Sequence, residues 1–330
     1  MSTRSVAAID CGTNSIRLLI SSVIAMDEDE VQLLDVERRM EIVRLGQGVD
    51  STGAFAPEAL ERTFAALRGY AELMREHGVG FGPESVRMVA TSATRDAANR
   101  QEFIDGVRSI IGVEPEVISG DEEAELSFIG ATAELEGAED GFKPPFLVVD
   151  IGGGSTEFVL GHTGGEEAGV VRAARSVDIG CVRMTERHLT QDPPPPAQVA
   201  AATADIDAAL EEAARAVPLD EAATVVCVAG TATTVAGIAE DLPAYEPERI
   251  HHTRVSAERT HAIAEELLAM PHEARAAIGV MHPGRVDVIG AGALILDRVV
   301  KRTGADGFVA SEHDILDGIA WSLCLSEVTE

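Results

Sequence analysis

The feature of this sequence that most constrains its fold is an internal repeat. The segment VAAIDCGTNSIRLLI, residues 6–20, aligns without gaps with FLVVDIGGGSTEFVL, residues 146–160. The shared positions are Asp10 with Asp150, Gly12 with Gly152, and Ser15 with Ser155. An apolar run precedes and follows each loop, which predicts two strand–turn–strand units. Two domains built from one ancestral unit, with a cleft between them, would explain the match. Coincidence is the alternative, because short hairpins often use Gly and Ser.

The rest of the chain alternates strand-like and helix-like segments. Residues 56–78 have apolar residues at helical spacing and end at a glycine, whereas VRMVA at 86–90 has the pattern of a buried strand. Two more strand–turn–helix patterns start at residues 116 and 224. The chain has 330 residues, of which 45% are apolar, enough for two domains with large cores. The sequence therefore predicts an α/β fold.

Composition excludes several classes of function. The net charge of −30 argues against nucleic acid and against anionic membranes as partners. The four cysteines are scattered without a CxxC pair, which is typical of a reduced, cytoplasmic protein without a disulfide or zinc framework. The N-terminus lacks the apolar region of a signal peptide, and no uncharged apolar run is long enough to span a membrane.

Four common functional motifs are missing. The only lysines, Lys143 and Lys301, do not lie in a GxxxxGK[ST] loop. The LGQGVDS segment at 45–51 has Ser51 where the third glycine of GxGxxG belongs, and it lacks the strand–helix context. Neither GxSxG nor HExxH occurs, so a serine hydrolase and a zinc protease are unsupported.

The two repeated loops have the residues of an anion site. Backbone N–H groups and hydroxyls converging in such a turn can bind phosphate oxygens without lysine. An aspartate at the end of a strand can hold Mg²⁺ directly or through water. Arg17 in the first copy aligns with Glu157 in the second, so one loop is cationic and the other acidic. The alternative is that the strand-end acids only cap turns.

Several further segments, in this order along the chain, extend the pattern. They are DCGTNSIR, ATSATRDAAN, VISGDEEAELSFIG, VVDIGGGSTEF, DIGCVRMTE, VAGTATTVAGI and the tail HPGRVDVIGAGALIL…SEHDILDGIA. Together they resemble the exopolyphosphatase/guanosine pentaphosphate phosphohydrolase (Ppx/GppA) family over almost the whole chain. The resemblance implies the actin-like ATPase/sugar kinase/Hsp70 architecture, in which two ribonuclease-H-like domains flank an active-site cleft.

The resemblance also implies a short, two-domain form without the additional C-terminal helical domains of longer relatives. We expect residues 1–122 to form the first domain and residues 123–311 the second. The C-terminal helix, residues 312–330, is expected to pack back on the first domain.

Site residues follow from the matching motifs. The resemblance implies that Glu123 is the catalytic base and that Asp150 is catalytic and binds metal, together with Asp10. The charge difference between the two loops suggests that Glu157 also faces a metal or a water. The implied phosphate-binding residues are Asn14, Ser15, Arg17, Arg95, Gly152, Gly153, Gly154, Ser155 and Thr156. Thr13 and Cys11 depart from the motif of the family, and neither departure changes the assignment.

Alternative roles remain open for some of these residues. Glu123 opens a helix, where an acid stabilises the helix dipole, although Glu122 would serve as well. Arg95 precedes a helix and is nearly as well explained as a surface residue. Arg183 is a weaker candidate that bridges domains in the alternative interpretation.

The expected reaction is hydrolysis of the terminal phosphoanhydride of inorganic polyphosphate, with Mg²⁺ or Mn²⁺ as cofactor. Because the net charge repels a polyanion, local arginines, N–H groups and the metal must bind it, helped by salt screening over about 8 Å. Conversion of pppGpp, a nucleotide of the stringent response, is the alternative substrate reaction. An actin-like ATPase or kinase and a silent nucleotide sensor are alternatives of other classes. A homodimer is also compatible with the sequence.

Overall fold

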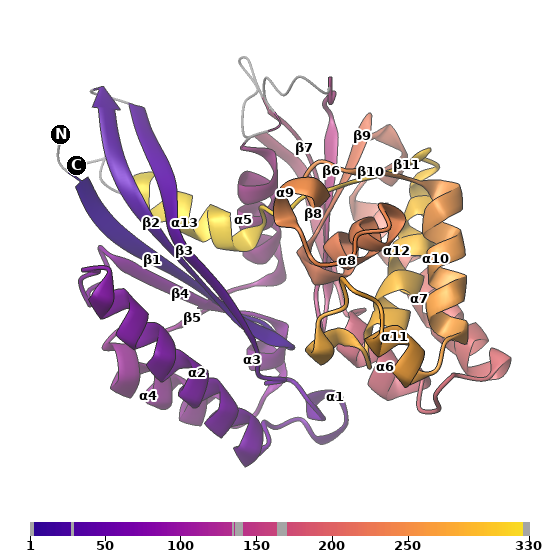
Figure 1. The fold of residues 1–330 in the computed structure, drawn as a ribbon, viewed down its shortest axis with the longest axis horizontal. Helices are drawn as coiled ribbons and strands as arrows, with labels where there is room; N and C mark the ends of the chain where they lie inside the picture. Colours follow the sequence, from indigo (N-terminus) through magenta and orange to yellow (C-terminus); the bar gives the residue numbers. More distant parts are fainter. Residues whose placement is uncertain (1–2, 28–29, 134, 136–140, 164–169, 326–330) are drawn as a thin grey trace. The chain divides into compact units, whose positions relative to one another are not determined.

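The computed structural model describes residues 3–27, 30–133, 135, 141–163 and 170–325 (Figure 1). The chain divides into two compact units, each described here by itself. Unit 1 comprises Met1–Leu126 and Ile315–Glu330, and unit 2 comprises Ser127–Asp314. These limits lie a few residues from the predicted ones at 122 and 312. Residues 326–330 of the expected C-terminal helix lie outside the described residues.

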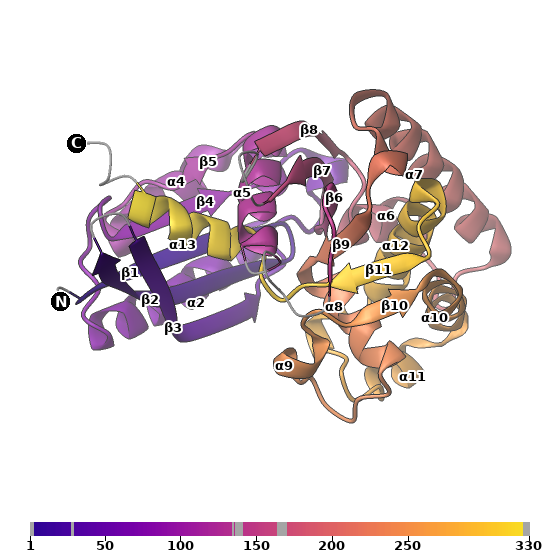
Figure 2. The ribbon, with the colours of Figure 1, turned by 90° about the horizontal axis from the view of Figure 1, so that it is seen from above.

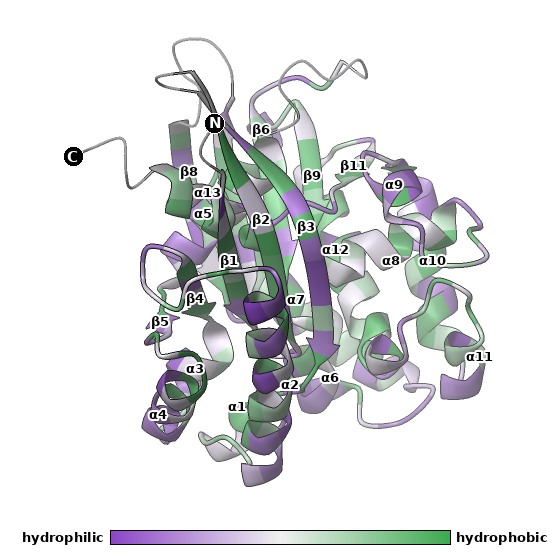
Figure 3. Ribbon diagram, turned by 60° about the vertical axis from the view of Figure 1, so that its left-hand side comes forward, coloured by the Kyte–Doolittle hydropathy of each residue, from purple (hydrophilic) through white to green (hydrophobic). Residues whose placement is uncertain are grey.

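Unit 1 contains a five-stranded mixed sheet of order β3-β2-β1-β4-β5. Its strands are β1 (Thr3–Cys11), β2 (Ser15–Asp27), β3 (Glu30–Ile42), β4 (Val86–Ala90) and β5 (Glu116–Val117). The first three strands form an antiparallel meander, and β4 and β5 then run parallel to β1. Strand β3 is the edge, and its hydrophilic part in Figure 3 corresponds to the charged run Glu37–Glu41.

Helices cover both faces of this sheet. They are α1 (Val49–Thr52), α2 (Pro57–Glu76), α3 (Ser92–Asp96), α4 (Arg100–Ile111), α5 (Gly120–Thr132) and α13 (Ile315–Leu325). Figure 1 shows α2 and α4 on one side of the strands and α13, in yellow, on the other. Because side chains alternate along a strand, Ile9 packs in the core with α2 and α4, whereas Ala8 packs against Ile319 of α13. Asp10 therefore lies on the α13 face of the sheet.

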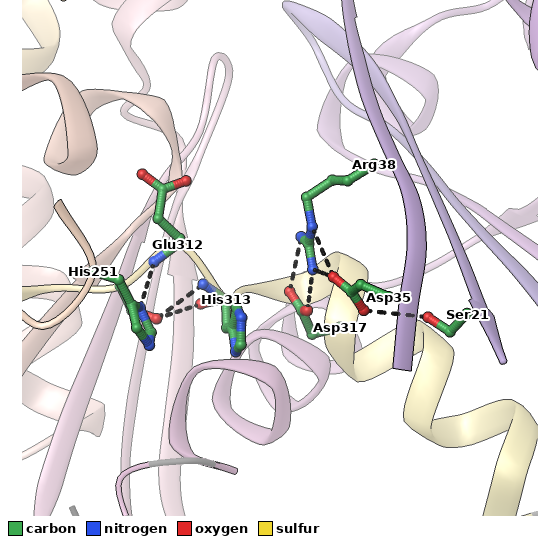
Figure 4. A network of polar contacts seen from close by, with 8 residues as sticks. Ser21, Asp35, Arg38, His251, Glu312, His313 and Asp317 are labelled. Atoms are coloured by element: carbon green, nitrogen blue, oxygen red, sulfur yellow. Dashed lines mark hydrogen bonds and ion pairs between the residues drawn. The ribbon is translucent and has the colours of Figure 1, made fainter. Parts of the chain in front are cut away.

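Helix α13 is held on unit 1 by polar contacts and by a close backbone approach. Arg38 of β3 donates hydrogen bonds to Asp317 of α13 and, at 2.9 Å, to Asp35 (Figure 4). A Cβ on Gly318 would lie 2.0 Å from the carbonyl oxygen of Leu126, so only glycine allows α13 and α5 to cross this closely. These contacts join the C-terminal helix to a sheet formed by residues far away in the sequence.

Unit 2 repeats this arrangement in a six-stranded sheet of order β10-β11-β9-β6-β7-β8 (Figure 2). Its strands are β6 (Phe146–Ile151), β7 (Thr156–His162), β8 (Val170–Val177), β9 (Thr224–Val228), β10 (Arg254–Ser256) and β11 (Gly307–Ala310). Again three antiparallel strands are followed by parallel ones, β9 beside β6 and β11 beside β9. Both units thus have the ribonuclease-H-like topology of the actin-like fold, and the fold class predicted from the sequence is confirmed.

The helices of unit 2 pack mainly around one large core. They are α6 (Cys181–His188), α7 (Pro196–Ala216), α8 (Ala229–Ala239), α9 (Pro247–Ile250), α10 (Ala257–Ala269), α11 (His272–Ala276) and α12 (Ile289–Thr303), with short 3₁₀ turns at Leu219–Glu221 and Pro283–Arg285. Leu147, Val149 and Ile151 of β6 face this core. Asp150 alternates with them and lies on the opposite face of the sheet. Among the described residues, no helix is long and apolar enough to cross a membrane.

Candidate active site

The two repeated segments fold into hairpins with the same register. In unit 1, Asp10 of β1 pairs with Arg17 of β2, and in unit 2, Asp150 of β6 pairs with Glu157 of β7. In each loop the glycine N–H donates to the carbonyl oxygen of the serine three positions later. The distances are 2.9 Å from Gly12 to Ser15 and 3.1 Å from Gly152 to Ser155. The spacing seen in the sequence therefore corresponds to one local structure that occurs twice.

The carbonyl groups of the second loop contact the start of α6. The N–H of Cys181 donates to Gly152 at 3.0 Å, and the N–H of Val182 donates to Gly153 at 2.9 Å. The side chain of Arg183 reaches the third carbonyl, with Nε 2.6 Å from the oxygen of Gly154. The structure thus gives Arg183 a contact inside unit 2.

Three N–H groups of the same loop, unlike that of Gly152, make no hydrogen bond among the described residues. Within the described part of the chain, the backbone N–H groups of Gly153, Gly154 and Ser155 have no hydrogen-bond acceptor. Gly152 and Gly153 are half-buried, whereas Gly154 and Ser155 are buried. Consecutive free N–H groups in a turn form an anion-binding concavity. The loop can therefore bind oxygens of a phosphate.

The hydroxyls predicted to assist this loop are less available. Thr156 has no exposed surface, and its hydroxyl donates to the carbonyl oxygen of Ile179 at 2.6 Å. Ser155 is buried as well. The predicted phosphate role therefore fits the N–H groups of this loop better than the Thr156 hydroxyl.

The first loop is held by the segment that follows β3. The carbonyl oxygen of Asn14 accepts from the N–H groups of Val43, at 3.1 Å, and Arg44, at 2.8 Å, and that of Thr13 accepts from Gly46 at 2.8 Å. Asn14 Oδ1 is buried and, within the described residues, has no hydrogen-bond partner. Asn14 and Ser15 are half-buried. Asn14 thus has an unsatisfied polar atom, as expected of a ligand-binding side chain.

The predicted metal-binding carboxylates each have a protein partner. Arg17 donates two hydrogen bonds to Asp10 Oδ2, from Nε at 3.0 Å and from Nη2 at 2.7 Å. The predicted phosphate-binding arginine and the predicted metal-binding aspartate therefore form one ion pair. Ser127 donates to Asp150 Oδ2 at 2.7 Å. Glu157 has no exposed surface and accepts from Ser176 at 2.7 Å.

Two of these carboxylates, Asp10 in unit 1 and Asp150 in unit 2, are each of the kind that a magnesium ion takes as a ligand. Among the described residues, no group of three His, Cys, Asp or Glu side chains is arranged to hold a metal. Mg²⁺ does not need such a cage, because it keeps several waters and typically takes one or two carboxylates plus substrate phosphates. Asp10 and Asp150, hard oxygen donors at the ends of β1 and β6, fit that requirement. Glu157, fully enclosed, fits it poorly.

Glu123 and Arg95 form an ion pair in unit 1. Arg95 Nη1 donates to Glu123 Oε2 at 2.8 Å and to the carbonyl oxygen of Ile118 at 3.0 Å. The Glu123 side chain is 10% exposed, whereas its neighbour Glu122 is 45% exposed and pairs with Arg87 at 3.1 Å. Each acid pairs with an arginine, and the two therefore differ in exposure, since Glu123 is enclosed and Glu122 is exposed.

Arg285 of unit 2 was not among the site residues predicted from the sequence. Its guanidinium lies against Gly230 at the start of α8, where a Cβ would be 2.2 Å from Arg285 Cζ. Its Nη1 donates to Thr234 at 3.3 Å. Burial raises the pKa of the Cys181 thiol and the Arg285 charge opposes this rise, with a net value of about 11, so this charge lies near the residue that binds Gly152. The turn-forming sequence HPGR was the only signal for it.

This combination of fold and loops is that of a known family. Residues 23–327 match the Ppx/GppA phosphatase family, and the chain belongs to it. Exopolyphosphatase 2 of Mycobacterium tuberculosis is 50% identical over 98% of this chain and 99% of its own length. The crystal structure of an exopolyphosphatase-like protein has a TM-score of 0.89 at 45% identity and covers 98% of both chains. That of an exopolyphosphatase from Cytophaga hutchinsonii has a TM-score of 0.82 at 25% identity, covering 99% of this chain and 100% of the other.

Proposed function

We propose that this protein is an exopolyphosphatase that hydrolyses the terminal phosphoanhydride of inorganic polyphosphate and releases orthophosphate. The observation that carries the proposal is the row of N–H groups at Gly153, Gly154 and Ser155, which have no acceptor among the described residues and follow β6, the strand that contains Asp150. Such a row suits the oxygens of a phosphoryl group. The similarity to proteins named exopolyphosphatases supports the same choice of substrate.

The residues have separate tasks in this proposal. Phosphoryl transfer needs positioning and neutralisation of charge rather than covalent chemistry by the protein. The second loop binds oxygens of the terminal phosphate, and Asn14 of the first loop offers its unsatisfied side chain. Glu123 orients and deprotonates the attacking water, a contribution of roughly 10²–10⁴-fold. Arg95 holds the Glu123 carboxylate in one orientation.

We further propose Mg²⁺, or Mn²⁺ in its place, as the cofactor. Asp10 in unit 1 and Asp150 in unit 2 are each a candidate ligand, and the ion would neutralise negative charge on the phosphate oxygens. The four cysteines are all buried free thiols, which supports a location in the reducing cytoplasm.

A side-by-side assay tests the function. Phosphate release is measured with Mg²⁺ from long polyphosphate, short polyphosphate, pppGpp and ATP. We expect polyphosphate to have the highest kcat/KM. A preference for pppGpp would assign the protein to the stringent response, and a preference for ATP with an acceptor would make it a kinase; either result overturns the proposal.

A matched pair of variants tests the base. Glu123→Gln should lose phosphate release by roughly 10²-fold or more, with an unchanged circular dichroism spectrum. Glu122→Gln alters the neighbouring acid in the same helical turn and should keep near-wild-type turnover, because Glu122 is exposed and pairs with a different arginine. Wild-type turnover in Glu123→Gln would refute the role of Glu123.

A further inference from the structure

The carbonyl groups of Gly152, Gly153 and Gly154 all accept hydrogen bonds from the start of α6. The first two receive backbone N–H groups of Cys181, Val182 and Arg183, between 2.9 and 3.1 Å. These N–H groups belong to the first turn of the helix, where they have no partner within the helix itself. The helix thus uses its N-terminus to hold a loop.

This anchoring decides where the N–H groups of the loop point. All peptide bonds of the loop are trans, because the cis bonds of the structure are Pro144–Pro145 and Asp192–Pro193. In a trans peptide the carbonyl of one residue and the N–H of the next point in opposite directions. Three carbonyls turned toward α6 therefore turn the N–H groups of Gly153, Gly154 and Ser155 away from it, on the side where they have no acceptor.

The first loop uses the same principle with backbone donors only. Its Thr13 and Asn14 carbonyls are held by N–H groups of Val43, Arg44 and Gly46, in the segment after the third strand of unit 1. The segment that holds the second loop also follows the third strand of its unit. The difference is Gly154, whose carbonyl receives its hydrogen bond from a side chain, Nε of Arg183.

We infer that Arg183 is a positioning residue that fixes the Gly154–Ser155 peptide and thereby completes the anion-binding row of N–H groups. This rests on the proposed function, in which that row binds the terminal phosphate. Arg183 is enclosed, with its side chain 12% exposed, as expected for an arginine held in one conformation. In this inference the Arg183 guanidinium affects phosphate binding by holding the loop.

Gly180 makes this contact sterically feasible. A Cβ at this position would lie 2.4 Å from the carbonyl carbon and oxygen of Gly153 and 2.5 Å from the nitrogen of Gly154. These are backbone atoms, so a larger residue must push α6 away from the loop. The dipeptide preceding Cys181, Ile179–Gly180, thus brings the helix to the loop, and Arg183 fixes its last carbonyl.

The experiment uses the full chain labelled with ¹⁵N-glycine and ¹⁵N-serine. Amide resonances of Gly153, Gly154 and Ser155 are followed by NMR without ligand and during titration with inorganic phosphate. The variants are Arg183→Met, Arg183→Lys and Gly180→Ala. Arg187→Met is the matched control, because Arg187 lies one turn further along α6 and pairs with Asp205 instead. Polyphosphate kinetics are measured on the same proteins.

A positioning role predicts changes before any phosphate is added. In Arg183→Met the Ser155 amide should move in the free protein, and phosphate-induced shifts should weaken for all three amides. kcat/KM should fall by about 10²-fold, the size expected of a misplacement of about 1 Å. Arg183→Lys should restore part of the loss, Gly180→Ala should shift the Gly153 and Gly154 amides, and Arg187→Met should match wild type.

Three outcomes would overturn the inference. Free-protein amides that match wild type in Arg183→Met, combined with a raised KM, would make Arg183 a direct phosphate ligand. Wild-type kinetics in Arg183→Met would show that Arg183 has no role in polyphosphate hydrolysis. If the three amide resonances of the wild-type protein do not shift when phosphate is added, the loop is not an anion-binding site. If these amides respond but polyphosphate is not hydrolysed, the positioning role stands and only the proposed function fails.

Discussion

Arg95 Nη1 lies 2.8 Å from Glu123 Oε2, so the proposed base is held by an arginine that the sequence had suggested for phosphate. The same nitrogen donates to the carbonyl oxygen of Ile118, just before α5, at 3.0 Å. An arginine fixed at two points orients a carboxylate well, because its donors have a rigid geometry. We therefore expect Arg95 to act on catalysis through Glu123.

Kinetics of Arg95→Met check this expectation. Without its donor the carboxylate is free to rotate, so kcat should fall by about 10²-fold, while KM changes little. Arg87→Met is the control, since Arg87 pairs with the neighbouring Glu122 and with Glu116, and it should leave kcat near wild type. A raised KM with unchanged kcat in Arg95→Met would instead support direct contact with phosphate.

The metal requirement gives a second prediction. Excess EDTA should abolish phosphate release, and Mg²⁺ or Mn²⁺ should restore it. Asp150→Asn should raise the Mg²⁺ concentration needed for half-maximal activity, because an amide oxygen carries no full charge. Asp207→Asn, which alters an aspartate of α7 that pairs with Arg298 of α12, should not change that concentration. Full activity in EDTA would refute the role of a divalent metal.

How much of this site could be predicted from the sequence depended on the range of the interactions. The contacts within each hairpin loop join residues that are close in the sequence, so residue spacing alone located Gly152 and Ser155. The family resemblance identified Glu123. The pairing of Arg183 with Gly154 joins residues 29 positions apart, and no local pattern encodes it. Hydroxyl and carboxylate identity also suggested Thr156 and Glu157, yet both are fully buried. When both faces of a sheet are covered, the side chains on both faces are buried. The alternation of apolar and polar residues along the strand therefore could not show that Thr156 and Glu157 are enclosed.

The fold class could be predicted from the sequence, because the alternation of strands and helices and the two copies of one motif are local patterns. The order of the strands and the packing of α13 on unit 1 depend on contacts between residues hundreds of positions apart, such as Arg38 with Asp317. Resemblance to a family supplied these relationships, which composition and periodicity do not contain.

Two helix-interior glycines should respond oppositely to alanine. Around Gly69 in α2, a Cβ would meet nothing within 4 Å, so Gly69→Ala should stabilise by about 0.5–1 kcal/mol through the lower entropy of the unfolded chain. In α4, a Cβ on Gly106 would lie 2.2 Å from Cζ of Phe64. Gly106→Ala should therefore destabilise by about 1–3 kcal/mol. Urea unfolding midpoints at constant slope measure both, and shifts of equal sign would contradict the packing described.

Glu312 gives a prediction for the dependence of stability on pH. It follows β11 in unit 2, where its carboxylate accepts from Tyr245 at 2.6 Å and its N–H donates to His251 (Figure 4). Burial raises the pKa of the Glu312 carboxyl above its ordinary value, and Asp314 adds to this, while the Tyr245 hydrogen bond and the charges of Arg285 and His251 oppose it. The folded protein therefore holds this proton more tightly than the unfolded chain does.

The sign of the effect follows from proton linkage. When the folded state binds the extra proton, stability falls as pH rises from the ordinary pKa through the raised one. Glu312→Gln keeps an acceptor for Tyr245 but cannot ionise, so its unfolding temperature should gain on wild type as pH rises above about 4, near the ordinary value of glutamate. Tyr245→Phe removes an influence that lowers the pKa, so the pH dependence should become steeper than in wild type. Parallel stability curves for wild type and Glu312→Gln would contradict the raised pKa.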